Sequence, residues 1–240
     1  MSPVVTHAKA YPFSIPEKSY VLGKSGYRLI GDGDTQLDLS NLTPVLACGS
    51  NQSPEQLARK FGDLDDHPIP VLKTRINDFD AVHSPHFSAY GSIPATLHYH
   101  PGVEATLFTN WLNDAQLERM HETEVAAENY HYVRLESISL HIEGGKRLDS
   151  VHCYISRRGA LAHDGQPLGL EAVPATGRHW PQVSQHDVQS LARDRLSPGA
   201  KLESFITQNV NDATTRRSRI AELAKNALPF TYDNVHVVAV

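Results

Sequence analysis

Apolar and polar positions alternate in short runs after residue 40, and this pattern predicts an α+β protein. The runs that predict strands are residues 44–47, 75–84, 95–100, 104–112, 130–142 and 150–156. The last two flank a Gly-Gly turn and are expected to form a hairpin.

The two ends of the chain show different patterns. Residues 1–40 are rich in Pro, Gly, Ser and Asp without a helical period, so we expect an irregular N-terminal lead-in. Helical spacing dominates residues 158–240. We interpret this segment as a helical C-terminal extension packed on a domain that spans residues 41–157.

Two helix starts are predicted between the strands. Ser53 is the expected N-cap of the first helix, with Pro54 at the first helical position and Gln56 completing a capping box. Asn113 is the expected N-cap of the second helix, with Gln116 three residues later.

The second helix carries glutamates on two different faces. Leu117, Met120 and Glu124 follow the i, i+3, i+7 spacing of one face, so Glu124 is expected to point inward. Glu118 and Glu122 share another face, which we interpret as solvated. An inward carboxylate is costly unless it is paired, which makes Glu124 a candidate for general acid/base chemistry. The alternative is a helix-end glutamate that reaches water or caps a neighbour.

A candidate binding loop follows the first strand. Residues 48–51, Cys-Gly-Ser-Asn, lie where a strand ends and a helix begins, so free backbone N–H groups and the helix dipole favour negative charge there. The alternative is a turn that serves conformation only, with Cys48 as a packing residue. A second Gly-Ser pair, Gly91-Ser92, leads into Pro94 and a strand. We therefore expect it to be a structural landmark and not a binding loop.

The composition narrows the class of partner. The chain has 240 residues, of which 40% are hydrophobic and 20% charged, and its formal net charge is -5. A negative chain does not favour a nucleic acid or an anionic membrane as partner. No apolar run approaches the roughly 18 residues of a membrane helix, and the first residues do not read as a secretory signal. We expect a cytoplasmic protein.

The segment HYHPGVE raises a metal-binding alternative. His98, His100 and Glu104 keep the H-x-H-x3-E spacing of a cupin metal motif. The glycines that flank such a motif are out of place here, and no second histidine segment has the right spacing. Solvent-facing histidines at a strand end are the preferred interpretation, so we assign no metal ligands.

The order of these features resembles the γ-glutamylcyclotransferase-like family over residues 44–156. The landmarks that carry the resemblance are Cys48-Gly49-Ser50-Asn51 in place of Y-G-S-N, Asp78-Phe79, Ala95-Thr96, Pro101-Gly102, and Leu117 through Glu124. The resemblance implies a small mixed β-barrel with flanking helices. The chain departs from the family pattern at Cys48, which replaces a tyrosine, and at Val125, which replaces a common glycine.

The resemblance also implies a reaction and a set of site residues. The loop of Cys48, Gly49, Ser50 and Asn51 would bind a γ-glutamyl-type small molecule, and Glu124 would act as general acid/base. The substrate's α-amine would attack its own γ-carbonyl and release 5-oxoproline and an amine, with no metal or organic cofactor. Tyr132 is our candidate for a further pocket residue, although the spacing leaves Tyr130 open as well. The alternatives are a binding module of the same fold without turnover and, third, the cupin-like metal enzyme. The oligomeric state stays open.

Overall fold

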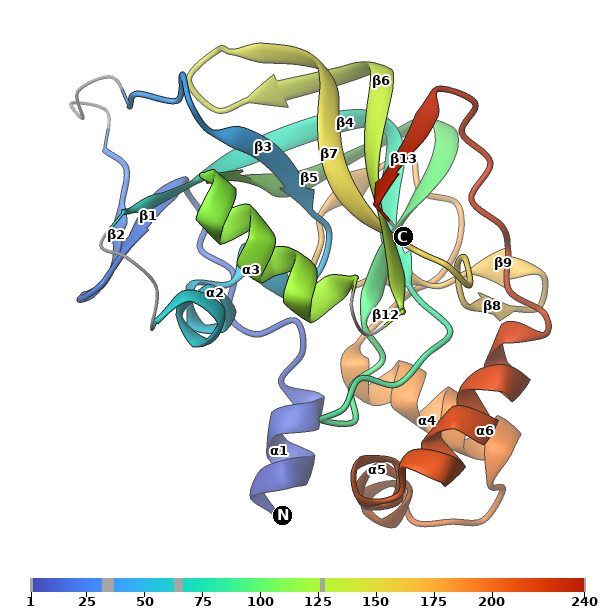
Figure 1. Ribbon diagram of the computed structural model, residues 1–240. Coiled ribbons are helices and arrows are strands. Elements are labelled where there is room, and N and C mark those ends of the chain that lie inside the picture. The colour runs from blue at the N-terminus through green and yellow to red at the C-terminus, as the bar shows by residue number, and fades with distance from the viewer. Residues whose placement is uncertain (1, 32–36, 63–66, 126–127, 240) are drawn as a thin grey trace.

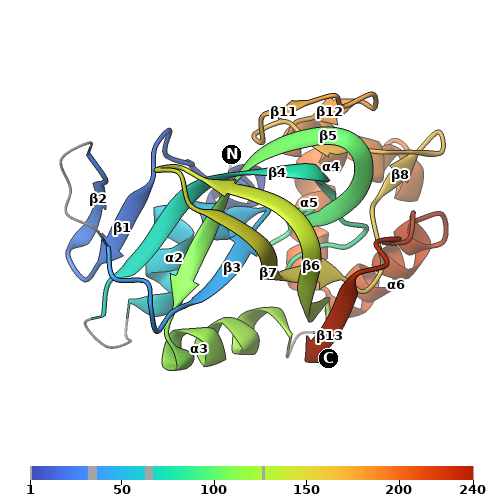
Figure 2. The ribbon, with the colours of Figure 1, turned by 90° about the horizontal axis from the view of Figure 1, so that it is seen from above.

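A closed mixed β-barrel forms the centre of the molecule (Figures 1 and 2). The computed structural model describes residues 2–31, 37–62, 67–125 and 128–239. The barrel strands within this part of the chain are β3 (Thr43–Ala47), β4 (Ile69–His83), β5 (Ala95–Leu112), β6 (Tyr130–Ile142) and β7 (Arg147–Ser156). They pair in the order β5–β3–β7–β6–β4, and β4 pairs back with β5. The β3–β7 pairing is parallel and the others are antiparallel. The predicted α+β fold with a small mixed barrel is confirmed.

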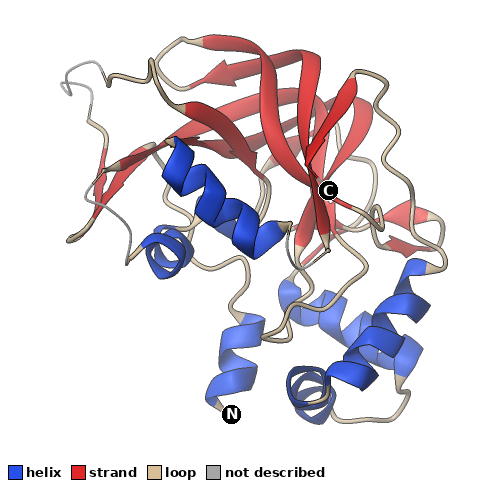
Figure 3. Cartoon of the chain, viewed as in Figure 1, coloured by secondary structure: helices blue, strands red, loops and turns tan. Residues whose placement is uncertain are grey.

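Helices surround the barrel in two groups (Figure 3). One group, α2 and α3, lies beside β3, and the other contains α4, α5 and α6, with α1 packed on α5. Their bounds are α1 (Pro3–Lys9), α2 (Pro54–Phe61), α3 (Asp114–Glu124), α4 (Gln185–Leu196), α5 (Leu202–Asn211) and α6 (Ala213–Ala224). The helical C-terminal extension is therefore present. None of the helices in the described ranges has the length and apolar character needed to cross a membrane.

Short strands extend the barrel sheet, except for the pair at residues 162–163 and 166–167, which forms a separate two-stranded sheet. Their bounds are β1 (Tyr20–Gly23), β2 (Gly26–Leu29), β8 (Ala162–His163), β9 (Gln166–Pro167), β10 (Gly169–Leu170), β11 (Ala175–Thr176), β12 (Gln182–Val183) and β13 (Val235–Ala239). Strand β13 pairs with β6, so the end of the described chain returns to the barrel. The domain boundaries at residues 41–157 and 158–240 stay a prediction.

The N-terminal lead-in is more ordered than we predicted. It contains helix α1 and the hairpin β1–β2, which pairs with β4. Ser2 caps α1, and Val5 and Ala8 on this helix pack against Ile206 of α5. Packing on a distant helix stabilises a short segment whose own sequence lacks a helical period. Residues 1 and 32–36 of the lead-in lie outside the described residues.

The two strands predicted at residues 95–100 and 104–112 form one strand, β5. Pro101-Gly102 bends this strand without ending it, because a bulge opposite Asp78 absorbs the irregularity. Asp78 has φ 65° and Gly102 has φ 87°. The Gly102 N–H donates to Asp78 Oδ1 at 2.8 Å, which holds the bend.

The predicted N-cap at Asn113 is confirmed, and the structure shows that it belongs to a capping box. Asn113 Oδ1 accepts from the Gln116 N–H at 2.8 Å, and Gln116 Oε1 accepts from the Asn113 N–H at 3.0 Å. The predicted box at Ser53 is wrong, because the Ser53 side chain makes no capping hydrogen bond. A single turn of 3-10 helix, η1 (Ser50–Gln52), precedes α2, and the Ser53 N–H donates to the Ser50 carbonyl at 2.9 Å.

Candidate active site

A cavity of about 760 Å³ opens where β3 ends. Its walls come from the loop after β3, from α2 and α3, from residues 86–95, and from β6 and β7. Among the residues named from the sequence, Cys48, Gly49, Ser50, Asn51 and Glu124 line this cavity. The fold therefore brings together a loop and a glutamate that are about seventy residues apart in the chain.

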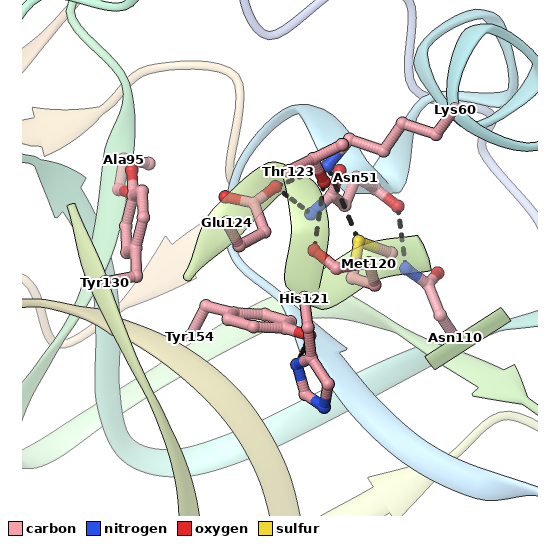
Figure 4. Close-up of polar contacts among 10 residues, drawn as sticks. All are labelled: Asn51, Lys60, Ala95, Asn110, Met120, His121, Thr123, Glu124, Tyr130 and Tyr154. Atoms are coloured by element: carbon pink, nitrogen blue, oxygen red, sulfur yellow. Dashed lines mark hydrogen bonds and ion pairs between the residues drawn. The ribbon is translucent and has the colours of Figure 1, made fainter. Parts of the chain in front are cut away.

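Glu124 lies at the end of α3 with two polar partners (Figure 4). Its Oε1 accepts a hydrogen bond from Asn51 Nδ2 at 3.1 Å and forms an ion pair with Lys60 of α2. The Glu124 side chain is 17% exposed and that of Lys60 is 7% exposed. The inward-facing carboxylate is thus paired, as its burial requires.

Glu122 behaves differently from Glu124. Its side chain is 59% exposed and pairs with Arg119 one turn earlier on the same helix. This is the solvated face that the periodicity predicts.

The loop after β3 lines the cavity and carries backbone donors without a protein partner. In the described part of the chain, the N–H groups of Gly49, Ser50 and Asn51 donate to no protein acceptor, because η1 begins there. Asn110 of β5 donates from Nδ2 to the Asn51 carbonyl at 3.1 Å, which fixes the loop on the barrel. Such N–H groups suit an oxyanion or a carboxylate.

Gly49 allows a close contact with the N-terminal segment. A Cβ at this position would lie 2.1 Å from the hydroxyl oxygen of Tyr11. That hydroxyl accepts from the Ala95 N–H at 2.7 Å, and Tyr11 is buried, so it has little room to move. A glycine is therefore required here by the neighbouring side chain.

Cys48 is a protonated thiol in this environment. Burial, with a smaller contribution from the negative charge of Glu124, raises the pKa of Cys48 to about 12. The side chain is buried and belongs to the barrel core. These surroundings do not favour an activated nucleophile, which agrees with the packing interpretation.

Tyr130, and not Tyr132, lines the cavity within the described residues. The two side chains lie on the same face of β6, but Tyr132 is two residues further along the strand. There α3 covers Tyr132, because the ring centroid of His121 lies 4.5 Å from that of Tyr132. The ring of His152 also stacks on Tyr132, with 5.1 Å between the centroids. The choice of Tyr132 as pocket residue is therefore corrected in favour of Tyr130.

The second Gly-Ser loop also reaches the cavity, although its glycine and serine do not. Ser88, Ala89 and Tyr90, immediately before Gly91-Ser92, line the wall. On the other side of the loop, Phe87 and Ile93 pack into the apolar cluster formed by α4, α5 and α6. The C-terminal helices thus hold this loop against the cavity, which sequence spacing did not predict.

The metal-binding alternative finds no support in the geometry. Among the described residues, no group of three or more His, Cys, Asp or Glu side chains is arranged to hold a metal ion. His98 and His100 lie edge-on to Trp180, and Glu104 pairs with Arg75 at 3.6 Å.

Several cavity residues were missed by sequence reasoning. They are Tyr11, Lys60, His86, Tyr90 and Tyr154. Lys60 had a local signal, because it is four residues after Gln56 on the same face of α2, and both line the cavity. The others come from separate segments that only the closed barrel brings together.

The chain was compared with known families, curated proteins and solved structures. No family model and no curated protein matches it. A gamma-glutamyl cyclotransferase is 14% identical, with 80% of this chain and 91% of that protein covered and a TM-score of 0.39. An uncharacterized protein from Homo sapiens is 20% identical, with 49% and 68% covered and a TM-score of 0.40. A protein from Arabidopsis thaliana is 12% identical, with 73% and 93% covered and a TM-score of 0.39. Similarity at these values does not assign an activity.

Proposed function

We propose that the protein is a γ-glutamylcyclotransferase-like enzyme that cyclises a γ-glutamyl amide and releases 5-oxoproline and an amine. The observation that carries this proposal is the position of Glu124: its carboxylate lies in one cavity with the free N–H groups of residues 49–51 and is bonded to Asn51. The cavity volume of about 760 Å³ suits a small molecule.

The proposed reaction needs a base, an oxyanion site and a bent substrate. Glu124 takes a proton from the α-ammonium group, and the α-nitrogen then attacks the γ-carbonyl carbon. The N–H groups of residues 49–51 stabilise the resulting oxyanion. The bond from the γ-carbon to the amide nitrogen then breaks. Two protons leave the α-nitrogen in total, and both end on the departing amine, with Glu124 as the carrier.

Ring closure is intramolecular, so the protein needs mainly to hold the reactive conformer. The neutral side chains around Glu124 suit this role. Burial raises the pKa of both Tyr11 and Tyr130 well above the usual value, which keeps the phenols protonated. Both rings are fixed, because Tyr130 donates to the Ala95 carbonyl at 3.0 Å and Tyr11 accepts from the Ala95 N–H.

A screen for 5-oxoproline release tests this proposal. The purified protein is incubated with a panel of γ-glutamyl amides, and Glu124→Gln is compared with Glu122→Gln, its neighbour on the exposed side of α3. We expect Glu124→Gln to keep the native fold, with lower stability because Lys60 loses its counter-ion, and to lose about a hundredfold or more in kcat, as removal of a general base does. Glu122→Gln keeps wild-type turnover. Full activity of Glu124→Gln excludes this residue as the base.

The ion pair with Lys60 favours a second candidate, a small-molecule binding module of the same fold without turnover. The carboxylate of Glu124 is already engaged by the ammonium group of Lys60 and by Asn51, as a carboxylate with a structural role would be. If no γ-glutamyl amide is turned over by wild-type protein but one binds by calorimetry, the binding module is the correct function. Turnover gained in Lys60→Met would show that the lysine suppresses the reaction.

A further inference from the structure

His86 is a buried cavity-lining side chain that the proposed reaction does not use. It is 2% exposed and lies edge-on to the ring of Tyr130, with 5.5 Å between the ring centroids. In Figure 4, Tyr130 and Lys60 lie on opposite sides of Glu124. His86 therefore belongs to the Tyr130 wall of the cavity.

A chain of hydroxyl groups determines which nitrogen of His86 carries the proton. Ser84 donates its hydroxyl hydrogen to Ser156 Oγ at 2.8 Å, and Ser156 Oγ also accepts from the Arg158 N–H at 3.1 Å. Ser84 Oγ lies 2.9 Å from His86 Nδ1. Since the hydrogen of Ser84 is already used, Ser84 can only accept, so Nδ1 carries the proton and Nε2 has a free lone pair.

The imidazole is held in its neutral form. Burial, and secondly the positive charge of Arg158, lowers the pKa of His86 to about 3. Within the described residues, Nε2 has no protein partner. His86 therefore contributes to the cavity an uncharged hydrogen-bond acceptor that no side chain satisfies.

Two other polar groups near His86 already form hydrogen bonds within the protein. Asn129 Oδ1 accepts from Arg158 at 3.0 Å, and the Tyr130 hydroxyl donates to the Ala95 carbonyl. A γ-glutamyl amide offers two N–H donors, the α-ammonium group and the amide N–H. Glu124 takes the first, and the N–H groups of residues 49–51 bind oxygen atoms. The amide N–H is left as the donor for His86.

We propose that His86 Nε2 accepts a hydrogen bond from the N–H of the scissile amide and thereby makes the cavity specific for amides over esters. This inference rests on the proposed function. An ester has no hydrogen at that position, so its bridging oxygen would face the His86 lone pair. A site that is built to accept an N–H leaves its acceptor unpaired when the donor is absent.

The test compares a γ-glutamyl alkylamide with the γ-glutamyl ester of the same alkyl group, each corrected for spontaneous cyclisation. The variant is His86→Asn, whose side-chain amide can replace Nδ1–H as donor to Ser84 while it removes the Nε2 acceptor. We expect kcat/KM for the amide to fall about tenfold or more, and that for the ester to change less than about twofold. Equal losses on both compounds overturn the inference and leave the proposed function standing. Absence of wild-type turnover on both compounds ends the proposed function and this inference with it.

A second measurement uses the wild-type protein, so it does not depend on whether a variant folds. In protein labelled with 15N-histidine, the imidazole shifts of His86 report its tautomer directly. We expect a proton on Nδ1 and none on Nε2 at pH 7. A proton on Nε2 would make that nitrogen a donor and overturn the inference.

Discussion

The ammonium group of Lys60 on α2 contacts the carboxylate of Glu124 on α3, and both side chains lie in the wall of the same cavity. Lys60 Nζ also lies 3.4 Å from Met120 Sδ, so its apolar stem follows the packed side of α3. This ion pair joins the two helices that form one wall of the cavity.

Lys60→Met should therefore destabilise the protein. The methionine can fill the space of the lysine stem, but it leaves a largely buried carboxylate without its counter-ion. We expect the free energy of unfolding in urea to fall by about 1–3 kcal/mol, less than for a fully enclosed pair because the cavity admits water. Combining Lys60→Met with Glu124→Gln should cost less than the sum of the two single changes. Strict additivity would contradict a stabilising pair.

Lys225→Met, which removes the exposed partner of Glu222, is the control and should change stability by less than about 1 kcal/mol.

Gly49 gives a second prediction, because its Cβ position is occupied by the Tyr11 hydroxyl. Gly49→Ala forces the loop away from Tyr11, and we expect about 1–3 kcal/mol of lost stability with lower ligand affinity. Tyr11→Phe removes the obstructing oxygen and should recover part of the loss in the double variant. Gly23→Ala is the control, since its nearest contact is 3.8 Å away. Thermal unfolding of the wild type, the two single variants, the double variant and the Gly23→Ala control checks this prediction, and an unchanged melting temperature of Gly49→Ala would refute it.

Patterns among residues close together in the sequence were enough to predict several helix and strand features around the site. The N-cap at Asn113 and the β6–β7 hairpin depend on residues a few positions apart, and both form as predicted. The inward direction of Glu124 follows from the helical repeat alone. These features need no knowledge of the rest of the chain.

The remainder of the site depends on contacts between distant segments. Tyr11, which contacts Gly49, follows helix α1, and α1 packs on α5. His86 precedes Phe87, which packs on the C-terminal helices. Tyr132 was preferred over Tyr130 because strand spacing cannot say which of two residues on one face lies under α3. The pattern of a single sequence does not report contacts between distant segments. It therefore predicts the helices and strands better than the residues of the cavity wall.

Asp80 supplies a third prediction, away from the cavity. Its buried carboxylate accepts from Arg178 Nε at 2.7 Å and Nη2 at 2.6 Å, and from Trp180 Nε1 at 3.0 Å. Asp80→Asn keeps the shape but leaves the guanidinium without its charge partner. We expect a loss of about 3–5 kcal/mol in urea unfolding, because a broken buried pair leaves an uncompensated charge. Glu104→Gln, which breaks the exposed pair with Arg75, is the control and should cost at most about 1 kcal/mol. Equal effects of the two changes would mean that the buried cluster does not stabilise the fold.

The last prediction concerns the pH dependence of stability. The pKa of His86 is about 3 in the folded protein and about 6.5 in an unfolded chain. Above pH 6.5 the imidazole is neutral in both states, so its contribution to stability is fully present. As the pH falls from 6.5 towards 3, the unfolded chain binds a proton that the folded protein does not, and stability is lost at up to about 1.4 kcal/mol per pH unit.

His86→Asn cannot titrate, so its unfolding free energy should fall less steeply than that of the wild type over this range. Urea unfolding of both proteins at several pH values measures the difference between their unfolding free energies. The other titrating groups are the same in both proteins, so their contributions cancel. If the unfolding free energies of the two proteins fell in parallel with pH, His86 would bind a proton as readily in the folded protein as in the unfolded chain. That result would contradict a neutral His86 held by burial.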